Sequence, residues 1–306
     1  DQSHADQVVS YLQQQNVQTI DYMISSHYDE DHLGGLVKCL NSFEVSNVFG
    51  PDYVHTSNLF NTFMNTATAN AIIVQYPSVG DTFDFGTGSF TVLAPDGISQ
   101  NSNDNSLVIK LENGSNSFIF TGDAEETSEQ DMISTGMNLD CDVLSVGHHG
   151  SASSTTWDFL EATSPSYAVI SCGVNNQYNH PSAETMGRLS DMEIPVFRTD
   201  KQGTIVALSD GTTISWSQDP CNDYTSGDAA QYQDESAVSE QEPVQTQNQL
   251  QEETQEQSYG NMVWIPATGE KYHRIPNCGR MNPDTAREVT QSEAEAMGYG
   301  PCSKCF

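Results

Sequence analysis

Two histidines and two aspartates lie within six residues near the start of the chain, at His27, Asp29, Asp31 and His32. They follow an apolar run, Ile20–Ile24, that is typical of a strand, and a Gly-Gly pair and a helix-like segment come after them. Imidazole nitrogens and carboxylate oxygens are good ligands for divalent cations, and packing alone does not explain four of them on one loop. The pattern predicts half of a two-metal site, whose chemistry would be hydrolysis by an activated water.

Further candidate ligands come at the ends of later strand-like segments. Asp123 follows Phe118–Thr121, the pair His148-His149 follows an apolar run, and His180 lies in a loop further on. Taken singly, each has an ordinary explanation: Asp123 suits a helix N-cap, and the histidines suit structural hydrogen bonds. Their joint occurrence with the first cluster favours a metal site.

Both strands and helices must position these side chains. Strand-like and helix-like segments alternate over residues 1–216, which indicates an α/β class domain, and Asp210-Gly211 predicts a hairpin. Besides Ile20–Ile24, the expected strands are Ser89–Ala94, Ser106–Leu111, Ser117–Thr121, Asp142–Val146, Tyr167–Ser171, Pro195–Arg198, Thr204–Leu208 and Thr212–Trp216. The expected helices are Ala5–Gln15, Leu33–Asn41, Ala124–Met132, Thr155–Ala162 and Ala183–Asp191.

Composition limits the classes of partner and location. The formal net charge is -32, from 10 Lys+Arg against 42 Asp+Glu. Such a field repels polyanions and disfavours broad nucleic-acid binding, although a metal site reverses the sign locally. No apolar stretch approaches the length of a transmembrane helix, so we expect no transmembrane segment. The acidity, the low Lys content and the abundant Asn, Ser, Thr and Gln are typical of a secreted, bacterial-type protein that is extracellular or on the cell surface.

The rest of the chain divides in two. Residues 217–258 hold ten acidic residues and no Lys or Arg, which predicts a flexible acidic linker. Residues 259–306 regain aromatic and apolar residues and form a second unit, which at this size needs a staple. His273, Cys278, Cys302 and Cys305 suit a structural Cys₃His zinc site. A disulfide with a spare thiol and a redox Cys-x-x-Cys pair are the alternatives.

The order of these motifs resembles the metallo-β-lactamase superfamily, and more narrowly the hydrolase domain of the ComEC-type competence proteins and their secreted relatives. The resemblance covers about residues 1–216. It rests on the stretches Ser26–Gly35, Asn105–Val108, Phe120–Glu125, Gly147–Ser151 and Asn175–Pro181. The C-terminal module is similar to the metal-binding finger of Ada-type repair proteins, which supports one structural zinc there and suggests a tether to another macromolecule.

The superfamily resemblance implies a four-layer αββα sandwich that holds two divalent cations, Zn or Mn, at one edge. By analogy His27 and Asp29 hold the first cation, Asp31 and His32 hold the second, and Asp123 bridges the two. The bridging position requires a carboxylate, because each of its oxygens can face one metal.

The resemblance also implies the roles of the remaining groups. One histidine of the His148-His149 pair completes the second site, and we favour His149, with His148 facing the substrate. A metal-bound hydroxide would attack phosphorus, Asp31 would orient it or accept its proton, and His148 or His180 would stabilise the leaving oxygen. The expected function is therefore a phosphodiesterase or nuclease.

Other functions stay open. One alternative keeps the fold and changes the substrate to a carboxyl ester, a lactone or a β-lactam, and choline-phosphate esters are a further substrate class. Recognition of choline would need an aromatic cage; the candidates are Tyr28, Tyr53, Trp157 and Tyr178. The non-enzymatic alternative is a metal-stabilised binding protein with a degraded pocket.

The chain departs from the family pattern in three ways. Asp29 stands where histidine is commoner, and the middle histidine of the superfamily has no counterpart, so we expect Asn103, Asp104 or Asn105 in its place. The domain usually opens with strands that end in an Asp-rich turn, and this sequence starts about where that turn would end. We therefore expect an N-terminally incomplete sheet with an exposed edge and a weaker first metal site.

Overall fold

A computed structural model describes residues 5–227, 262–265, 271–273, 286–290, 294 and 297–301. The chain divides into two units, Asp1–Glu240 and Gln241–Phe306. In the described parts of both units, no helix has the length and apolar character that crossing a membrane requires.

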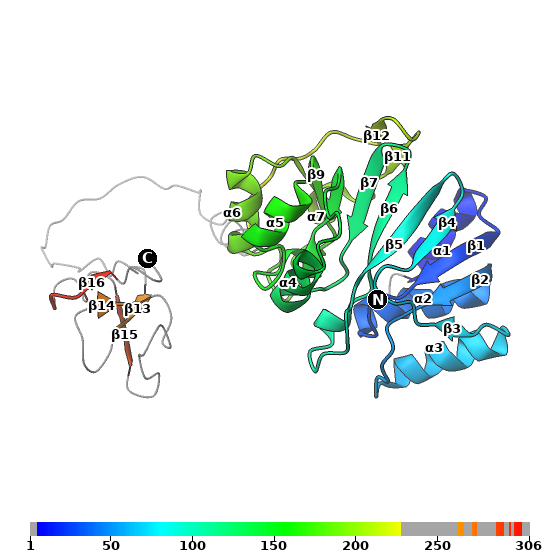
Figure 1. Cartoon of the computed structure of the whole chain (residues 1–306), viewed down its shortest axis with the longest axis horizontal. Coiled ribbons are helices and arrows are strands. Elements are labelled where there is room, and N and C mark those ends of the chain that lie inside the picture. Colours follow the sequence, from blue (N-terminus) through cyan, green and yellow to red (C-terminus); the bar gives the residue numbers. More distant parts are fainter. Residues whose placement is uncertain are drawn as a thin grey trace, which may run out of the picture. The chain divides into compact units, whose positions relative to one another are not determined.

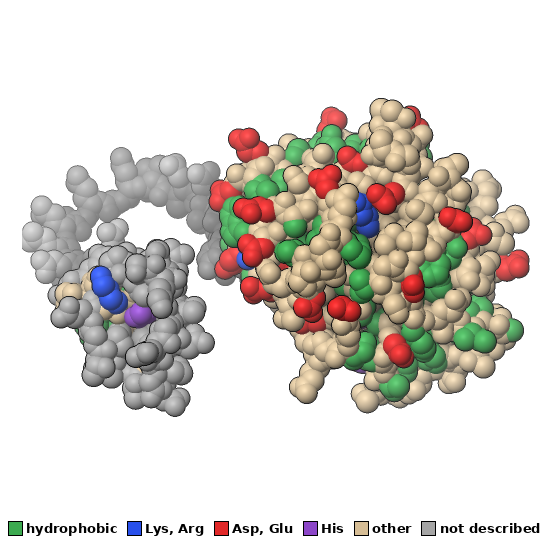
Figure 2. All heavy atoms as spheres, viewed as in Figure 1, with side chains coloured by type: hydrophobic (Ala, Val, Ile, Leu, Met, Phe, Trp, Pro, Cys, Tyr) green, Lys and Arg blue, Asp and Glu red, His purple; other side chains and the backbone are tan. Residues whose placement is uncertain are grey.

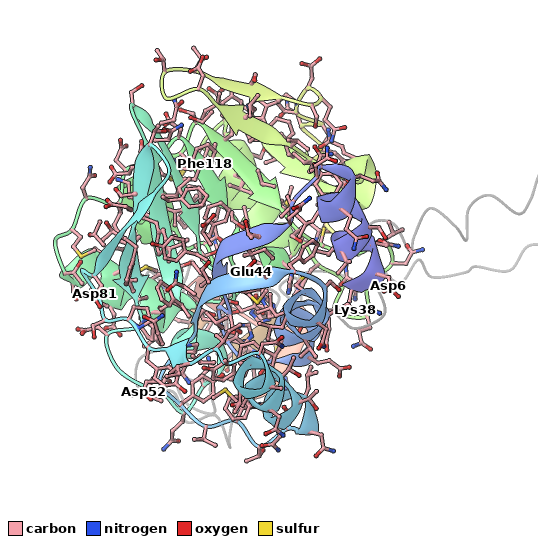
Figure 3. All side chains as sticks on the ribbon, turned by 90° about the vertical axis from the view of Figure 1, so that its right-hand side faces the viewer. Asp6, Lys38, Glu44, Asp52, Asp81 and Phe118 are labelled. Atoms are coloured by element: carbon pink, nitrogen blue, oxygen red, sulfur yellow. The ribbon has the colours of Figure 1, made fainter. Side chains whose placement is uncertain are left out.

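The first unit begins with a parallel three-stranded sheet of order β1-β2-β3, covered on one face by three helices (Figure 1). The strands are β1 (Thr19–Ile24), β2 (Glu44–Phe49) and β3 (Val74–Gln75); the helices are α1 (Ala5–Gln14), α2 (Glu30–Ser42) and α3 (Asn58–Ala69). Met23 and Val48 of the sheet pack against Leu40 and Phe63 of the helices. An ion pair of 2.6 Å between Asp6 and Lys38 joins α1 to α2 at the surface (Figure 3).

A seven-stranded mixed sheet follows, with the order β10-β9-β8-β7-β6-β5-β4. Its strands are β4 (Thr82–Phe85), β5 (Gly88–Ala94), β6 (Val108–Asn113), β7 (Asn116–Phe120), β8 (Val143–Ser145), β9 (Tyr167–Ile170) and β10 (Val196–Arg198). Helices α4 (Glu126–Ser134), α5 (Trp157–Thr163) and α6 (Ala183–Asp191) cover one face, and α7 (Thr199–Gln202) follows β10 (Figure 1). Side chains alternate along β7, so that Ile119 packs under the helices while Phe118 lines the opposite face (Figure 3).

A third apolar cluster joins the two sheets. Phe49 of β2 packs with Phe90, Val92 and Leu107, and Tyr22 of β1 lies against the same cluster. The two sheets thus pack face to face with helices outside each, and this confirms the predicted four-layer α/β sandwich.

Part of the inner face of the large sheet is uncovered. In the described residues β1 has a strand partner on one side only. Phe120 of β7 is 46% exposed, and it lines a cavity of about 560 Å³ together with Phe118 and Trp216. This part of the large sheet therefore presents an apolar surface to solvent.

The expected elements all form, with ends that differ by a few residues. The predicted hairpin at Asp210-Gly211 joins β11 (Ala207–Ser209) to β12 (Ile214–Trp216). In the described part of the large unit, five α-helices and strands were not predicted: β2, α3, β3, β4 and α7. Helix α3 is rich in Asn and Thr, which favour helices weakly, and it forms because Phe60, Phe63 and Ala67 are buried along one side.

The predicted boundary at residue 216 is too early. Arg198 is buried, and its guanidinium donates to Asp200 and to the main-chain oxygens of Asp223, at 3.0 Å, and Thr225. The Tyr224 hydroxyl donates to the Ile194 carbonyl at 2.8 Å. Residues 217–227 therefore belong to the large unit, because they supply acceptors to a charge that has left water. The rest of the predicted linker, from residue 228, lies outside the described residues.

The second unit has a small core of its own. Strand β13 (Met262–Ile265) pairs antiparallel with β15 (Arg287–Thr290), and β14 (Lys271–Tyr272) pairs parallel with β16 (Gly300–Pro301). Val263, Tyr272 and Val289 are buried together. The main chain of His273 exchanges two hydrogen bonds with Trp264, of 2.7 and 2.8 Å.

The metal site proposed for this unit remains a prediction. Cys278, Cys302 and Cys305 lie outside the described residues. His273 itself is described, on the strand-like segment that pairs with β13.

Ending the chain at residue 216 should destabilise the large unit relative to a chain that ends at Gly227. Removal of residues 217–227 leaves Arg198 with fewer acceptors, and hydrogen bonds to a buried charge contribute about 1.5–3 kcal/mol each. We expect the free energy of unfolding, measured in urea, to fall by roughly 3 kcal/mol or more. A chain that ends at Glu240 is the control and should match the one that ends at Gly227; equal stability of all three would contradict the revised boundary.

Candidate metal centre

The first ligand cluster lies on the connection from β1 to α2. The loop is fixed to both sheets, because Ser25 donates its N–H to the Phe49 carbonyl at 2.9 Å and the Ser26 carbonyl accepts from Leu107 at 2.7 Å. Asp29 occupies the N-cap position of α2, and its carbonyl accepts from His32 at 3.2 Å. The turn from this loop into α2 places the candidate ligands of the first cluster at one edge of the sandwich.

Asp123 enters the cluster at the carboxyl end of β7. Gly122 before it has a φ of +55°, and a Cβ there would lie 2.6 Å from Cβ of Ser26, so only glycine fits. The Asp123 N–H donates to Ser106 at 3.0 Å, and the side chain is buried. The helix-cap alternative for Asp123 is wrong, since the N-cap position of α4 belongs to Glu125.

The adjacent pair His148 and His149 reaches the site through a strained turn. Both residues have left-handed backbone conformations, with φ of +47° and +56°, which ordinary residues seldom adopt. His148 donates its N–H to the Gly122 carbonyl at 3.1 Å. Gly147 donates to the Thr155 hydroxyl at 3.1 Å, and the buried carboxylate of Glu129 accepts from the N–H of Thr155 and from Thr156. These contacts hold two neighbouring histidines so that both face the same carboxylate.

One oxygen of Asp123 faces the second half of the predicted site. Its Oδ1 lies 3.1 Å from Nε2 of His32 and 3.6 Å from Nε2 of His149. The Asp31 carboxylate lies 3.3 Å from His149 and 3.7 Å from His32. Asp31, His32 and His149 meet the spacing that a single metal ion requires. The structure thus brings the predicted ligands of the second metal together.

The other oxygen of Asp123 faces the first half. Its Oδ2 lies 3.9 Å from Nε2 of His27 and 3.7 Å from Nε2 of His148. Asp29 approaches His27 to 3.7 Å from the side of the protein surface. Since His27 is fully buried and Asp29 is partly exposed, this half of the cluster is open to solvent on the Asp29 side.

The donor atoms fit divalent cations. Nδ1 of His149 lies 2.7 Å from the Ser171 carbonyl, which can only accept, so this nitrogen carries a proton and Nε2 of the neutral ring carries a lone pair. Nε2 of His32 is only 3.2 Å away, and two imidazole nitrogens this close need a proton or a cation between them. Nε2 of His27 is buried, and the described residues offer it no hydrogen-bond partner, which is the state expected of a metal ligand.

The charges of the cluster depend on one another. The hydrogen bond from His149 lowers the pKa of Asp31. Burial alone would raise the pKa of Asp123, but the neighbouring histidines, His32 first, outweigh it and the pKa is lowered. Burial would lower the pKa of His149, but the carboxylates of Asp31 and Asp123 raise it to about 9. Metal binding at this half of the cluster therefore competes with a proton on His149.

Two residues near the cluster were missed by the sequence analysis. Glu125 lies 3.1 Å from Nδ1 of His148, and its carboxylate accepts from Asn101 and Asn103 at 2.9 Å each. Although burial raises the pKa of Glu125, the amide donors outweigh it and the pKa is lowered. A signal was present, because Glu125 lies two residues after the Thr-Gly-Asp motif, but it was interpreted as part of a helix.

The other missed residue is His55, which follows the unpredicted strand β2. The Ser57 N–H donates to Nδ1 of His55 at 3.3 Å, so a neutral His55 carries its proton on Nε2. This Nε2 lies 3.8 Å from Asp29. His55 therefore faces Asp29 from the side opposite His27 and helps to orient that carboxylate.

The residues expected in place of a middle histidine form hydrogen bonds elsewhere. Asn105 bonds to the main chain of Ser99, Asp104 accepts from the first turn of α4, and Asn103 holds Glu125. That expectation is wrong, because all three side chains support the loop before β6 and α4. The ring of His180 lies 5.6 Å from that of His148, and its role as a phosphate or leaving-group contact stays a prediction.

The four aromatic candidates for a choline cage do not share one surface. Tyr28 is buried, donates its hydroxyl to the Pro51 carbonyl at 2.8 Å and packs on Tyr53. Only Tyr178 lines a groove at the cluster.

Comparison with known proteins gives consistent matches over the first unit. A family model described as the metallo-beta-lactamase superfamily matches residues 2–174. The chain is 33% identical over 199 residues to ComE operon protein 3 of Bacillus subtilis, covering 65% of this chain and 26% of that protein. It is 30% identical to Recombination protein 2 of Haemophilus influenzae (65% and 23% covered) and to Competence protein ComA of Neisseria gonorrhoeae (65% and 26% covered). The chain thus spans about a quarter of the length of the curated relatives it matches.

Replacement of Asp123 by alanine should remove the shared ligand of both halves of the cluster. We expect the number of Mn²⁺ ions bound per chain to fall from two to one or none, as measured by titration followed by electron paramagnetic resonance. Mn²⁺ suits this count because thiolates in the second unit bind it poorly. Asp158→Ala, an exposed aspartate on α5, is the control; two bound ions in Asp123→Ala would contradict the bridging role.

Proposed function

Because the chain belongs to the metallo-beta-lactamase superfamily, we propose that its large unit is a metal-dependent hydrolase of phosphodiesters, with a nucleic acid or a small phosphoester as substrate. The motifs predicted this superfamily and its competence-type relatives, and both predictions are confirmed. The zinc finger of the second unit and its role as a tether stay predictions.

One observation carries the proposal. The two oxygens of the buried Asp123 face different imidazole nitrogens: Oδ1 faces those of His32 and His149, and Oδ2 faces that of His27. A single structural metal would need one such set, whereas a shared carboxylate suits a pair of cations. The mixed nitrogen and oxygen donors favour Zn or Mn.

The residues around the cluster suit hydrolysis. Two bound cations would supply the Lewis acidity that activates water and polarises a phosphoryl oxygen. Asp31 lines the groove beside the cluster, where it can orient the attacking water and accept its proton. The Glu125 carboxylate, 3.1 Å from Nδ1 of His148, orients that ring, so that Nε2 of His148 can donate a proton to the leaving oxygen. His180, beside His148, contacts the phosphate.

The relatives and the composition support the substrate class and the location. One relative is named for recombination and one for competence, and recombination is a reaction of DNA. The acidity of the chain and its few lysines favour an extracellular or cell-surface setting. In the described residues the four cysteines of the large unit are free thiols, so its stability does not depend on disulfides.

The purified protein with Mn²⁺ or Zn²⁺ should hydrolyse bis-p-nitrophenyl phosphate and single-stranded DNA, and EDTA should abolish both activities. A pair of cations can stabilise both the attacking and the leaving oxygen of an in-line displacement at phosphorus. Lactones and nitrocefin, tested in parallel, should react at least about tenfold more slowly in kcat/KM, a difference of about 1.4 kcal/mol. If the lactones or nitrocefin react faster than the phosphodiesters, the function is hydrolysis of carboxyl esters, lactones or β-lactams instead. Two bound metals without any activity would favour a binding protein.

Glu125→Gln should lower kcat by about 10- to 100-fold on a dinucleotide, because loss of a carboxylate behind a functional histidine has effects of this size. The loss should be much smaller on bis-p-nitrophenyl phosphate, since nitrophenolate leaves without a proton. Glu126→Gln changes the next, exposed residue and is the matched control. An equal loss on both substrates would show that Glu125 does not act through proton donation by His148.

A further inference from the structure

A groove of about 630 Å³ lies beside the metal cluster on the side of Asp29 and Asp31. One wall comes from the segment after β2, with His55 and Ser57, and the other wall is Tyr178 from the loop between β9 and α6. The groove therefore starts at two of the predicted metal ligands and leads away from them over an aromatic side chain. A substrate held at the cluster would extend along it.

Tyr178 is exposed but held in place. Its ring is stacked on His180, with ring centres 5.8 Å apart and planes at 21°, while the residue as a whole is 68% exposed. Asn176 fixes the loop, because its side-chain oxygen accepts from the N–H groups of Tyr178 and His180 at 3.2 and 2.9 Å. A further bond of 2.8 Å from Gly227 ties down the end of the loop at Pro181. The free face of the Tyr178 ring is thus preorganised for a flat partner.

The lining of the groove offers no positive charge that could bind a run of phosphates. None of its lining residues is Lys or Arg, and Glu30 adds a carboxylate that the proposed metals do not use. Over residues 5–227 every Lys and Arg side chain already has a partner in the same unit: Lys38, Lys110, Arg188, Arg198 and Lys201. On the face of the large unit shown in Figure 2, acidic side chains far outnumber basic ones. A long polyanion therefore finds few charge contacts here.

We infer that Tyr178 forms a stacking subsite for one nucleobase next to the phosphodiester at the metal cluster, a role that rests on the proposed phosphodiesterase function. A base stacks on an aromatic ring without needing a cation, and each such contact contributes about 1–3 kcal/mol. The substrate is accordingly single-stranded, since a base in a duplex keeps its faces stacked on its neighbours. Affinity comes from one base and one metal-bound phosphate rather than from a charged channel.

The test compares two substrates that share a leaving group and differ in the base. Thymidine 5′-(p-nitrophenyl phosphate) carries a base, and methyl p-nitrophenyl phosphate does not. Tyr178→Ala should lower kcat/KM for the thymidine ester by about 5- to 150-fold, which corresponds to 1–3 kcal/mol. It should leave the methyl ester within about twofold. Tyr178→Phe, which keeps the ring, should behave as the unmodified protein on both.

Matched controls and a binding measurement decide the other outcomes. Tyr11→Ala removes an exposed tyrosine from α1, away from the groove, and should change neither rate. Equal losses on both esters, or no loss on the thymidine ester, would overturn the subsite. Activity on neither ester would sink the proposed function alone. In that event calorimetric binding of thymidine 5′-monophosphate to the metal-loaded protein decides: weaker binding to Tyr178→Ala supports the subsite, and equal binding overturns it.

Discussion

The burial of one carboxylate among four imidazoles is the constraint on which the site depends. A charge that leaves water is costly unless opposite charges or hydrogen bonds replace the solvent. The Asp123 N–H donates to a serine hydroxyl, histidines surround both carboxylate oxygens, and the side chain is buried. Gly122, whose place no larger residue can take, allows the β1–α2 loop and the end of β7 to approach closely enough for this arrangement. The two sheets are thus joined at the edge by electrostatics and in the middle by aromatic packing.

The same constraint explains which parts of the site were visible in the sequence. His27, Asp29, Asp31 and His32 share a short loop, so their proximity follows from chain connectivity alone. Asp123 and the His148-His149 pair were assigned through motifs. The local sequence does not show that the ends of β7 and β8 lie beside the first loop. Glu125 and His55 act only through tertiary neighbours. Their roles depend on the turn after Asp123 and on a strand, β2, that the sequence analysis missed.

The limits of the fold prediction have a similar origin. Strands such as β5 and β7 carry continuous apolar patterns and were found, whereas α3 has weak helix formers and depends on burial of Phe60 and Phe63. Residues 217–227 look like a linker by composition, since they are polar and acidic. They are ordered because Arg198, a buried cation at the end of β10, takes their carbonyl oxygens as partners. The composition of a segment shows that it is polar, but it does not show whether a buried charge far away in the sequence binds its main-chain oxygens.

The acidity of the chain and a phosphodiester substrate are compatible if the cations at the site, rather than the protein surface, attract the anion. Each basic side chain of residues 5–227 already serves the fold: Arg188 binds the loop after the histidine pair, and Arg198 binds the segment after β12. What the surface can add beside the metals is an aromatic face and hydrogen bonds, and the groove at Tyr178 supplies the first. Recognition by stacking has the further property that salt weakens it little, since screening acts on charges and not on the contact of two rings. A hydrolase built in this way keeps its preference for a base-bearing strand in a saline medium, where proteins that bind through phosphate contacts lose affinity steeply.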